Sequence, residues 1–553
     1  MLSHRAEPSL SCPTTTGSRP CWLLIAVAVV VLTLAAATRL YQLDKPLWLD
    51  ELHTSWAARG NWSEVAQRAR DGNQPPVYFW LCHVVTQGTG GGEVRLRLPS
   101  LLASLLLLPA AWWLLRRMAG SWTAGLVAGY LLAIDPIQIV FAQEARVYAL
   151  VQLVTLLHVG VFALVTTDAR WPRRLALILL TVLLFYLHYT SLLVLTGELV
   201  WYVLARRWKA GNEGGTSSTP EGGPSPYTAW KLAADLAVAL VGTLPGWGAL
   251  GEVYGRREVW RQIMGPVRVS QLFTQFNWLT LVAPACVVAA GAWFIQRRWA
   301  RANNVPPSDE PHAELSNAAW AGLLACWFLV PLLLVWMATA AGLLSLMLPR
   351  YLLIIAPVPA LAAGWLTTFA RHPGLRIASV LAVCLWATLQ TSPPYGYVRE
   401  DWRAAIATIE AQERSVEQEG SDDMPDAVES APVVLWAALV EGGDRDRLER
   451  DQRFREYLLF PLQGHYRFER ARPLEPLANA APDKLLPGLL TDRQRDSIRS
   501  HGSAWIIYRA WQRDVSEHAD TIGQQLAEPG DTWQATTTKV GPLVVVRLTR
   551  TME

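Results

Sequence analysis

Long uninterrupted apolar runs constrain this chain more than any other feature. The first runs from Cys21 to Thr38 without a charged residue. A bilayer core needs about 20 mostly apolar residues per helix, because every backbone N–H and C=O must be satisfied within the segment. Ten further runs predict a polytopic all-α membrane protein with about eleven transmembrane helices. They are Pro99–Leu115, Ala124–Ile134, Tyr148–Val165, Leu175–Leu187, Ser191–Leu204, Leu232–Gly248, Trp278–Ile295, Ala318–Ala341, Leu352–Phe369 and Ile377–Leu389.

Composition supports this reading of the runs. Hydrophobic residues make up 52% of the 553 residues and charged residues only 17%, against about 25% charged in ordinary soluble domains. This composition excludes a disordered chain and a collagen-like one. A net charge of +3 gives no argument for a nucleic-acid partner. The six cysteines have no metal-ligand spacing and imply no disulfide framework.

Basic residues predict the orientation of the spans. Lys and Arg concentrate in cytoplasmic loops, and basic clusters here fall at every second junction between spans. Residues 1–20 are therefore expected to be a cytoplasmic tail, whereas residues 39–98 and everything after Gln390 are expected outside. The clusters are Arg116-Arg117, Arg170/Arg173/Arg174, Arg206-Arg207/Lys209, Arg297-Arg298/Arg301 and Arg371/Arg376.

These boundaries define the expected domains. Residues 21–390 form the transmembrane module, with an outer loop at 39–98 and a flexible, Gly- and Ser-rich cytoplasmic loop at 209–228. The outer loop holds two amphipathic stretches, Leu52–Arg70 and Pro76–Val85, which we expect to lie at the membrane interface. Ala35-Ala36-Ala37 resembles a signal-peptide cleavage site, but the long n-region and the many later spans favour an uncleaved anchor.

Residues 391–553 are expected to form a separate extracytoplasmic α/β domain, because charge density rises sharply after Glu400. Asp401 is a suitable cap for a helix through Ile409. Three apolar runs of strand length predict buried strands. They are Val433–Leu439, Ala504–Tyr508 and Leu543–Leu548. We find no chemical motif in this domain.

Charged residues at the outer ends of the spans are the candidate site. Asp50 and Glu51 follow the first span closely, and Glu144 and Arg146 lie before the fourth. Glu144 and Arg146 are two residues apart, so they are poorly placed to neutralise each other and each needs a partner elsewhere. For both pairs a purely structural role, as a helix start or a loop contact, is the alternative.

Two later rim segments complete the set. His188-Tyr189 ends the fifth span, and Pro349-Arg350-Tyr351 precedes the tenth. A rim arginine is commonly a headgroup anchor, and it is also a good ligand for a lipid phosphate. All of these residues fall on one predicted side of the membrane. We therefore expect two carboxylates, two arginines and a histidine to meet in one outward-facing cavity.

The ordered motifs resemble those of the polytopic GT-C glycosyltransferases of the family 39 type, which includes protein O-mannosyltransferases and bacterial aminoarabinose transferases. The resemblance covers about Leu23 to Leu389. The matching residues are Trp48-Leu49-Asp50-Glu51, Pro75-Pro76, Arg95-Leu96-Arg97-Leu98-Pro99-Ser100, Gln143-Glu144-Ala145-Arg146 with Tyr148, His188-Tyr189 and Pro349-Arg350-Tyr351. After Asp50-Glu51 the chain reads Leu52-His53-Thr54 rather than the Arg-Tyr pair of aminoarabinose transferases, which argues against lipid A as the acceptor.

The resemblance implies an inverting transferase that uses a sugar on a polyprenyl monophosphate and a glycan, lipid or protein hydroxyl as acceptor. The donor phosphate is already a good leaving group, so the chief need is a base for that hydroxyl. Asp50 is the expected base, Glu51 is expected to orient the acceptor, and Arg146 and Arg350 are expected to bind the phosphate. Glu144, Tyr148, His188, Tyr189 and Tyr351 are expected to support them. No metal ligand set is predicted and no cofactor is certain, while a divalent cation stays open.

Two other classes remain as alternatives. A transporter or flippase of lipid-linked sugars predicts buried charges near mid-span and broken helices, whereas these spans are nearly free of charge at their centres. A membrane-anchored binding protein predicts that the residues at the span ends are dispensable. The favoured transferase is expected in the bacterial inner membrane, with its site outside.

The predicted orientation is testable with reporter fusions. A reporter joined at Gly215 and one joined at Gln390 are expected on opposite sides of the membrane, because an odd number of predicted spans separates them. Paired phosphatase and fluorescent-protein fusions measure this directly. The same side for both reporters would contradict the assignment.

Overall fold

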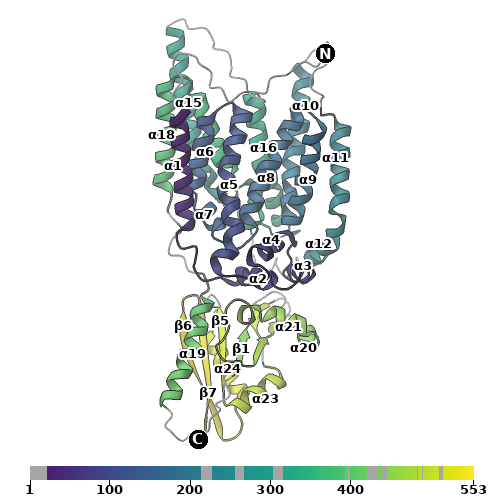
Figure 1. Ribbon diagram of the computed structural model, residues 1–553, viewed down its shortest axis with the longest axis vertical. Coiled ribbons are helices and arrows are strands. Elements are labelled where there is room, and N and C mark those ends of the chain that lie inside the picture. Colours follow the sequence, from purple (N-terminus) through teal and green to yellow (C-terminus); the bar gives the residue numbers. More distant parts are fainter. Residues whose placement is uncertain are drawn as a thin grey trace.

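The computed structural model describes residues 21–212, 227–255, 267–302, 316–344, 346–392, 394, 399–419, 432–436, 445–481, 484–488, 490–509 and 515–552. A bundle of long helices stands on a smaller α/β domain (Figure 1). The expected cytoplasmic tail 1–20 and most of the loop 209–228 lie outside the described residues.

The bundle is formed by helices that overlap every predicted span. The N-terminal half holds α1 (Cys21–Leu40), α2 (Leu49–Ala57), α3 (Trp62–Asp71), α4 (Val77–Thr86), α5 (Glu93–Ala119), α6 (Trp122–Ile134), α7 (Pro136–Ala142), α8 (Tyr148–Thr167), α9 (Trp171–Leu187) and α10 (Val194–Asn212). The second half holds α11 (Ala229–Thr243), α12 (Trp247–Gly255), α14 (Ser270–Thr274), α15 (Trp278–Ala302), α16 (Asn317–Ala340), α17 (Val358–Leu366) and α18 (Pro373–Gln390).

Short 3₁₀ helices join or extend several of these elements. They are η1 (Tyr189–Leu193), η2 (Leu244–Gly246), η3 (Gln275–Asn277), η4 (Pro349–Tyr351), η5 (Leu353–Ile355) and η6 (Thr367–Phe369).

The length and apolarity of the helices make this an integral multi-pass membrane protein. Seven helical segments within the described residues are long and apolar enough to cross a bilayer, and there are eight if the bent pair α6 and α7 counts as one span. The predicted all-α fold is therefore confirmed, but the predicted count of eleven is not. Large apolar side chains remain exposed along outer helices, as lipid contact requires. Examples are Val29, Val30, Leu102, Leu106, Val238, Val241, Val287, Leu381 and Leu385.

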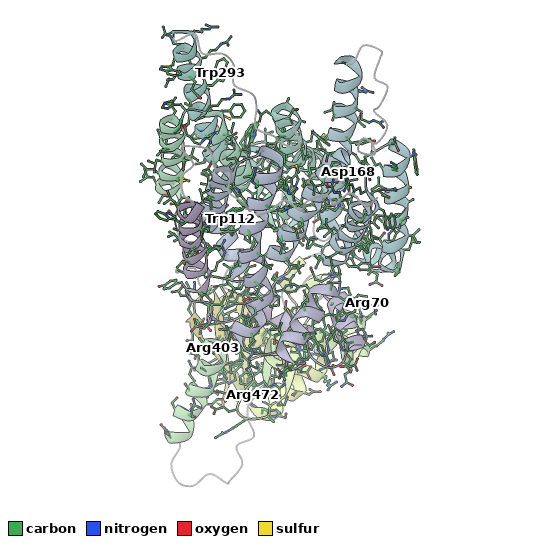
Figure 2. All side chains as sticks on the ribbon, turned by 45° about the horizontal axis from the view of Figure 1, so that its top comes forward. Arg70, Trp112, Asp168, Trp293, Arg403 and Arg472 are labelled. Atoms are coloured by element: carbon green, nitrogen blue, oxygen red, sulfur yellow. The ribbon has the colours of Figure 1, made fainter. Side chains whose placement is uncertain are left out.

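Two of the predicted basic clusters lie at one end of the bundle. Arg170 and Arg173 pair with Asp168, and Arg297 lies over the Trp293 ring. Figure 2 shows Asp168 and Trp293 at the end away from the α/β domain, which carries the labelled Arg403 and Arg472. These two basic clusters thus share the end opposite the α/β domain, as the alternation of the sequence predicts.

The outer loop forms a layer of short helices between the bundle and the α/β domain (Figure 1). The two predicted amphipathic stretches are the helices α2, α3 and α4. Asn61 caps α3 by accepting hydrogen bonds from the Ser63 and Glu64 amides, both at 3.0 Å. This layer carries Asp50 and Glu51.

A sharp bend separates α6 from α7. Pro136 begins α7, and Asp135 accepts a hydrogen bond from the Ile137 amide at 2.8 Å, which caps the new helix. The two helix axes differ by 68°. Residues 143–147 then run without a helix to Tyr148, where α8 begins. Glu144 and Arg146 therefore sit on an irregular linker, so their directions are set by local contacts and not by helical spacing.

The C-terminal part is a small α/β domain, as predicted. Its five-stranded sheet has the order β2-β1-β5-β7-β6, with β1 parallel to β2 and β5 and the rest antiparallel. The predicted strands appear as β1 (Val433–Trp436), β5 (Ser503–Arg509) and β7 (Leu543–Met552). The sequence reading missed β2 (Leu474–Leu477), β3 (Asn479–Ala481), β4 (Lys484–Pro487) and β6 (Asp531–Val540).

The first helix of this domain confirms the predicted cap, because Asp401 accepts a hydrogen bond from the Ala404 amide at 2.9 Å. Six helices of the described residues accompany the sheet. They are α19 (Trp402–Glu419), α20 (Arg445–Arg450), α21 (Gln452–Leu458), α22 (Phe460–Gln463), α23 (Asp492–His501) and α24 (Val515–Leu526).

Candidate active site

The first turn of α2 presents Asp50 between the bundle and the α/β domain. Trp48 precedes the helix in an extended conformation, and Asp50 and Glu51 occupy its first turn. Carboxylates are favoured there by the helix dipole. The Asp50 side chain keeps 25% of its surface exposed, whereas the Glu51 side chain keeps 1%. Adjacent residues thus face a partly open surface and a closed interior.

Two arginines from distant segments converge on Asp50. Arg350 Nη1 lies 3.6 Å from Asp50 Oδ2, and Arg146 Nη2 lies 4.0 Å from the same oxygen. Arg146 Nη1 also donates a hydrogen bond to the Asp50 carbonyl at 3.2 Å. Of the five groups expected to meet in one cavity, Asp50, Arg146 and Arg350 therefore lie together. The carboxylate contacts are longer than the usual 2.7–2.9 Å of a charge-assisted hydrogen bond, so the cluster is loose.

These arginines control the charge of Asp50. Burial alone would raise the pKa of the Asp50 carboxyl, but Arg146, Arg350, Arg509 and His53 together outweigh burial and hold that pKa below its usual value. Asp50 is therefore ionised at neutral pH. With one carboxylate between two guanidinium groups, the cluster carries a surplus positive charge, which suits it to an anionic ligand.

Glu51 is held by a buried ion pair with Arg97 of α5. Arg97 Nε donates to Glu51 Oε1 at 2.7 Å and Arg97 Nη2 donates to Oε2 at 2.6 Å. The Ala145 amide donates to Oε1 at 2.7 Å. This bidentate geometry ties α2 to α5 and to the linker that carries Arg146. Contact of Glu51 with an acceptor would require breaking the pair, so the geometry favours a positioning role.

The backbone of Arg146 has its own support. Ser100 donates a hydrogen bond from its hydroxyl to the Arg146 carbonyl at 2.7 Å, and the Tyr78 hydroxyl lies 2.7 Å from Ser100 Oγ. Because Ser100 spends its single proton on the carbonyl, Tyr78 is the donor to Ser100. Ser100 belongs to the Arg95–Ser100 motif, so one face of α5 fixes both α2 and the Arg146 linker.

Glu144 pairs with Arg399. This agrees with the prediction that Glu144 needs a partner other than Arg146. Arg399 Nη2 lies 2.5 Å from Glu144 Oε1, and the Arg399 guanidinium lies 4.1 Å from the centre of the Trp48 ring. Burial raises the pKa of Glu144 from its ordinary 4.5 to about 7, and the nearby carboxylates of Glu51 and Asp50 add to the rise against the opposing Arg399.

His188 supports the segment that carries Arg350. Thr190 donates from its hydroxyl to the Tyr351 carbonyl at 3.1 Å, so the His188 Nδ1 atom, 2.8 Å from Thr190 Oγ1, is the donor to that hydroxyl. Burial lowers the pKa of His188 to about 3, with further lowering by Arg146 and Arg350. The imidazole is therefore neutral, with its Nε2 unprotonated.

The three predicted tyrosines lie around the same segments. Tyr148 and Tyr351 each lie under a guanidinium, with Arg146 5.8 Å and Arg350 5.2 Å from the respective ring centres. Tyr189 packs edge-on against Phe185, with ring centres 5.2 Å apart, and burial raises its pKa to about 12. No contact in the described part of the chain joins the Tyr189 hydroxyl to Asp50.

Besides Arg399, two residues of the α/β domain reach this site. Glu400 Oε2 accepts a hydrogen bond from the Leu49 amide at 3.3 Å, at the start of α2. Arg509, at the end of β5, donates to Glu400 Oε1 from Nε at 2.6 Å. The sequence alone predicts no role for Arg97, Arg399, Glu400 or Arg509. Arg97 and Ser100 were signalled by their motif, but nothing local distinguished the other three.

A cavity of about 270 Å³ lies on the Glu51 side of the site, and the described residues around it are Gln42, Lys45, Pro46, Trp48, Glu51, Arg97, Val140, Gln143, Glu144, Pro394 and Arg399. Among the described residues, no group of three or more His, Cys, Asp or Glu side chains is placed to hold a metal ion.

A second ionisable pair lies inside the bundle. His158 of α8 and Glu198 of α10 are buried, and His158 Nδ1 lies 3.0 Å from Glu198 Oε1. His158 Nε2 lies 2.9 Å from Thr181 Oγ1. Thr181 donates its proton to the Leu177 carbonyl at 2.8 Å, so His158 Nε2 must donate to Thr181. The expectation of nearly charge-free span centres therefore has an exception.

Residues 73–212, about a quarter of the chain, match the family model described as dolichyl-phosphate-mannose-protein mannosyltransferase. The resemblance to the GT-C enzymes of family 39 type is confirmed over this segment. The segment contains Arg97, Glu144, Arg146 and His188, whereas Asp50 and Arg350 lie outside it.

Among solved structures the chain is similar to ArnT from Cupriavidus metallidurans bound to undecaprenyl phosphate, with 14% identity, a TM-score of 0.49 and coverage of 96% of this chain and 98% of that chain. The apo state of ArnT from the same organism gives 14% identity, a TM-score of 0.47 and coverage of 95% and 97%. Archaeal oligosaccharyltransferase AglB from Archaeoglobus fulgidus, in complex with an inhibitory peptide and a dolichol-phosphate, gives 11% identity and a TM-score of 0.40. The match covers 88% of this chain and 69% of that chain. No curated protein sequence matches the chain.

Replacing Arg97 with methionine is expected to destabilise the protein strongly. The change leaves the Glu51 carboxylate buried and uncompensated, which costs about 3–5 kcal/mol. Thermal unfolding of the detergent-purified protein measures the loss. The double variant Glu51→Gln/Arg97→Met should recover part of it, because no buried charge then remains unpaired.

Arg447 offers a matched control, because its pair with Asp451 is exposed, with side chains 44% and 38% accessible. Arg447→Met should change stability by less than about 0.5 kcal/mol. Equal losses for Arg97→Met and Arg447→Met would contradict the importance given to the buried pair.

The raised pKa of Glu144 predicts a pH-dependent stability difference. A carboxyl whose folded pKa lies above its unfolded value stabilises the fold at low pH, and this contribution is lost as pH rises from about 4.5 through about 7. Glu144→Gln removes the titration, so the melting temperature of wild type relative to this variant should fall between pH 5 and pH 8. A difference that stays constant with pH would contradict the assignment.

Proposed function

We propose that this chain is an inverting glycosyltransferase that moves a sugar from a polyprenyl-phosphate donor to an acceptor hydroxyl. The observation that carries the proposal is a partly exposed aspartate between two arginines, at the end of a membrane bundle. An aspartate there supplies a base, and two arginines bind a phosphate. The family match over residues 73–212 supports the same reaction class, since its description names a dolichyl-phosphate sugar donor.

In the proposed reaction the acceptor oxygen attacks the anomeric carbon as the bond from that carbon to the phosphate oxygen breaks. The acceptor proton passes to the Asp50 carboxylate, and the phosphate leaves with the bonding electrons. Attack on the face opposite the phosphate inverts the anomeric centre. Arg146 and Arg350 stabilise the charge that develops on the phosphate.

The loose arginine cluster explains how a strongly ionised aspartate becomes a useful base. Without donor, both arginines lower the pKa of Asp50. A bound phosphate takes over much of their field, so the proton affinity of Asp50 rises when the donor is in place. Donor binding would therefore prepare the base, and Asp50 is kept ionised until then.

The other predicted site residues take supporting roles in this proposal. Glu51 holds α2 through Arg97, His188 holds the Arg350 segment through Thr190, and Tyr148 and Tyr351 lie against the two phosphate-binding arginines. Tyr189 packs against Phe185 next to His188. Glu144 borders the cavity of about 270 Å³ with Arg399, which makes it a second polar group for an acceptor. The outer face of a bacterial inner membrane is the proposed location.

Two observations match the expectations for a lipid-linked sugar transporter, the bend between α6 and α7 and the His158–Glu198 pair inside the bundle. The bend leads directly into the linker of Glu144 and Arg146, so the proposed transferase site accounts for it. The cavity beside the His158–Glu198 pair has a volume of about 20 Å³. That volume holds a single water molecule and no sugar. The pair therefore gives little support to a sugar pathway, and the transferase remains the favoured function.

Asp50→Asn is expected to abolish sugar transfer while the protein still folds, because asparagine keeps the shape and removes the base. The loss should reach at least about 100-fold, within the usual range for general bases. Transfer from polyprenyl-phosphate sugars in detergent, followed by mass spectrometry, measures it. Full activity of this variant would remove Asp50 as the base.

Arg350→Ala is expected to weaken binding of the donor, because one of two phosphate ligands is lost. Titration of the purified protein with undecaprenyl phosphate should show about tenfold weaker affinity, the size of one charge-assisted hydrogen bond. The exposed Arg414, which pairs with Glu469 on the α/β domain, provides the control through Arg414→Ala. Unchanged affinity in Arg350→Ala would refute the phosphate role.

A further inference from the structure

The start of α2 depends on a residue from outside the membrane module. The first amides of any helix lack partners within the helix. Here the Leu49 amide donates to Glu400, which lies 351 positions later in the sequence. Leu49 immediately precedes Asp50, so a carboxylate of the α/β domain serves as a cap for the helix that presents the proposed base.

Glu400 is itself fixed by the α/β domain. Its side chain is 10% exposed and receives Arg509 Nη2 on Oε1 at 2.5 Å. Trp402 Nε1 donates to Oε2 at 3.1 Å. Arg509 ends β5, the middle strand of the five-stranded sheet. A buried carboxylate with this set of donors has little freedom, so the position of the sheet sets the position of the cap.

Arg509 also acts on Asp50 through its charge. After burial, which raises the pKa of Asp50, the groups that lower it are Arg146, Arg350, Arg509 and His53, in that order. Glu144 and Tyr148 face the same cluster and interact with Asp50. Arg509 therefore brings a charge from the α/β domain into the field that acts on Asp50.

We propose that Glu400 and Arg509 are positioning residues that hold the first turn of α2, and with it Asp50, in its working geometry. The α/β domain then completes the site. This inference rests on the proposed function only for the role of Asp50. The holding of α2 is a separate physical claim with its own readout.

Hydrogen exchange of the purified full-length protein tests the holding directly and needs no substrate. In the double variant Glu400→Leu/Arg509→Met both charges are removed together, so no unpaired buried charge remains. Peptides that span residues 47–57 should exchange about fivefold faster than in wild type, the size expected for a lost helix cap. Unchanged exchange in a folded double variant would overturn the proposal.

A matched control lies at the opposite end of the same sheet. Arg550 of β7 pairs with Asp531 at 2.5 Å, next to the start of β5 and away from Arg509. Arg550→Met should leave exchange of residues 47–57 unchanged. Faster exchange in this control, equal to that of the double variant, would mean that any damage to the domain loosens α2, and it would overturn the specific role of Glu400 and Arg509.

Kinetics supply the second arm. Arg509→Met should lower kcat by on the order of tenfold to a hundredfold, with KM for the donor nearly unchanged, because the phosphate ligands remain. The acid limb of the profile of kcat against pH should move to higher pH in Arg509→Met. Arg509→Lys, which keeps the charge, should return this limb to its wild-type position. An unmoved limb in folded Arg509→Met overturns the electrostatic part. Absence of transfer in wild type would count against the proposed function, while the exchange result still decides the holding of α2.

Discussion

The buried pair of Glu51 and Arg97 is the interaction on which the rest of the site depends. Arg97 is saturated by the carboxylate and by the carbonyls of Leu43, Lys45 and Pro46, while Glu51 also receives the Ala145 amide. One ion pair thus joins the first span's exit, α2, α5 and the Arg146 linker. Burying two charges is costly unless the donors and acceptors are satisfied, and here Arg97 donates five hydrogen bonds, which offsets that cost.

Around this point, neighbouring residues divide the work by the direction in which they face. Glu51 turns inward and is a structural anchor, whereas Asp50, one position earlier on the same helix turn, keeps a quarter of its surface open between Arg146 and Arg350. The α/β domain adds Glu400 and Arg509 from the other side. The Arg146 linker, the Arg350 segment and the α/β domain therefore orient the proposed base, which itself lies on α2.

Sequence alone predicted the fold class and the gathering of Asp50, Arg146 and Arg350, because apolar runs and basic clusters are local signals of bilayer contact. It could not predict the number of full spans, since short helices such as α9 and the broken pair α6 and α7 depend on packing. It missed Glu400 because its partner, the Leu49 amide, lies 351 positions earlier in the sequence. It missed Arg509 because its partner is Glu400 of the same α/β domain. The inward turn of Glu51 was likewise invisible, since exposure of adjacent residues depends on what α5 presents.

The surplus positive charge of the Asp50 cluster has a consequence for turnover. In the proposed reaction the donor is a phosphodiester with one negative charge, and the spent lipid carrier is a phosphomonoester with nearly two at neutral pH. Two guanidinium groups hold the second species more tightly than the first. In the proposed reaction the used carrier would then leave more slowly than the donor, and added salt would speed its release by screening the two guanidinium groups.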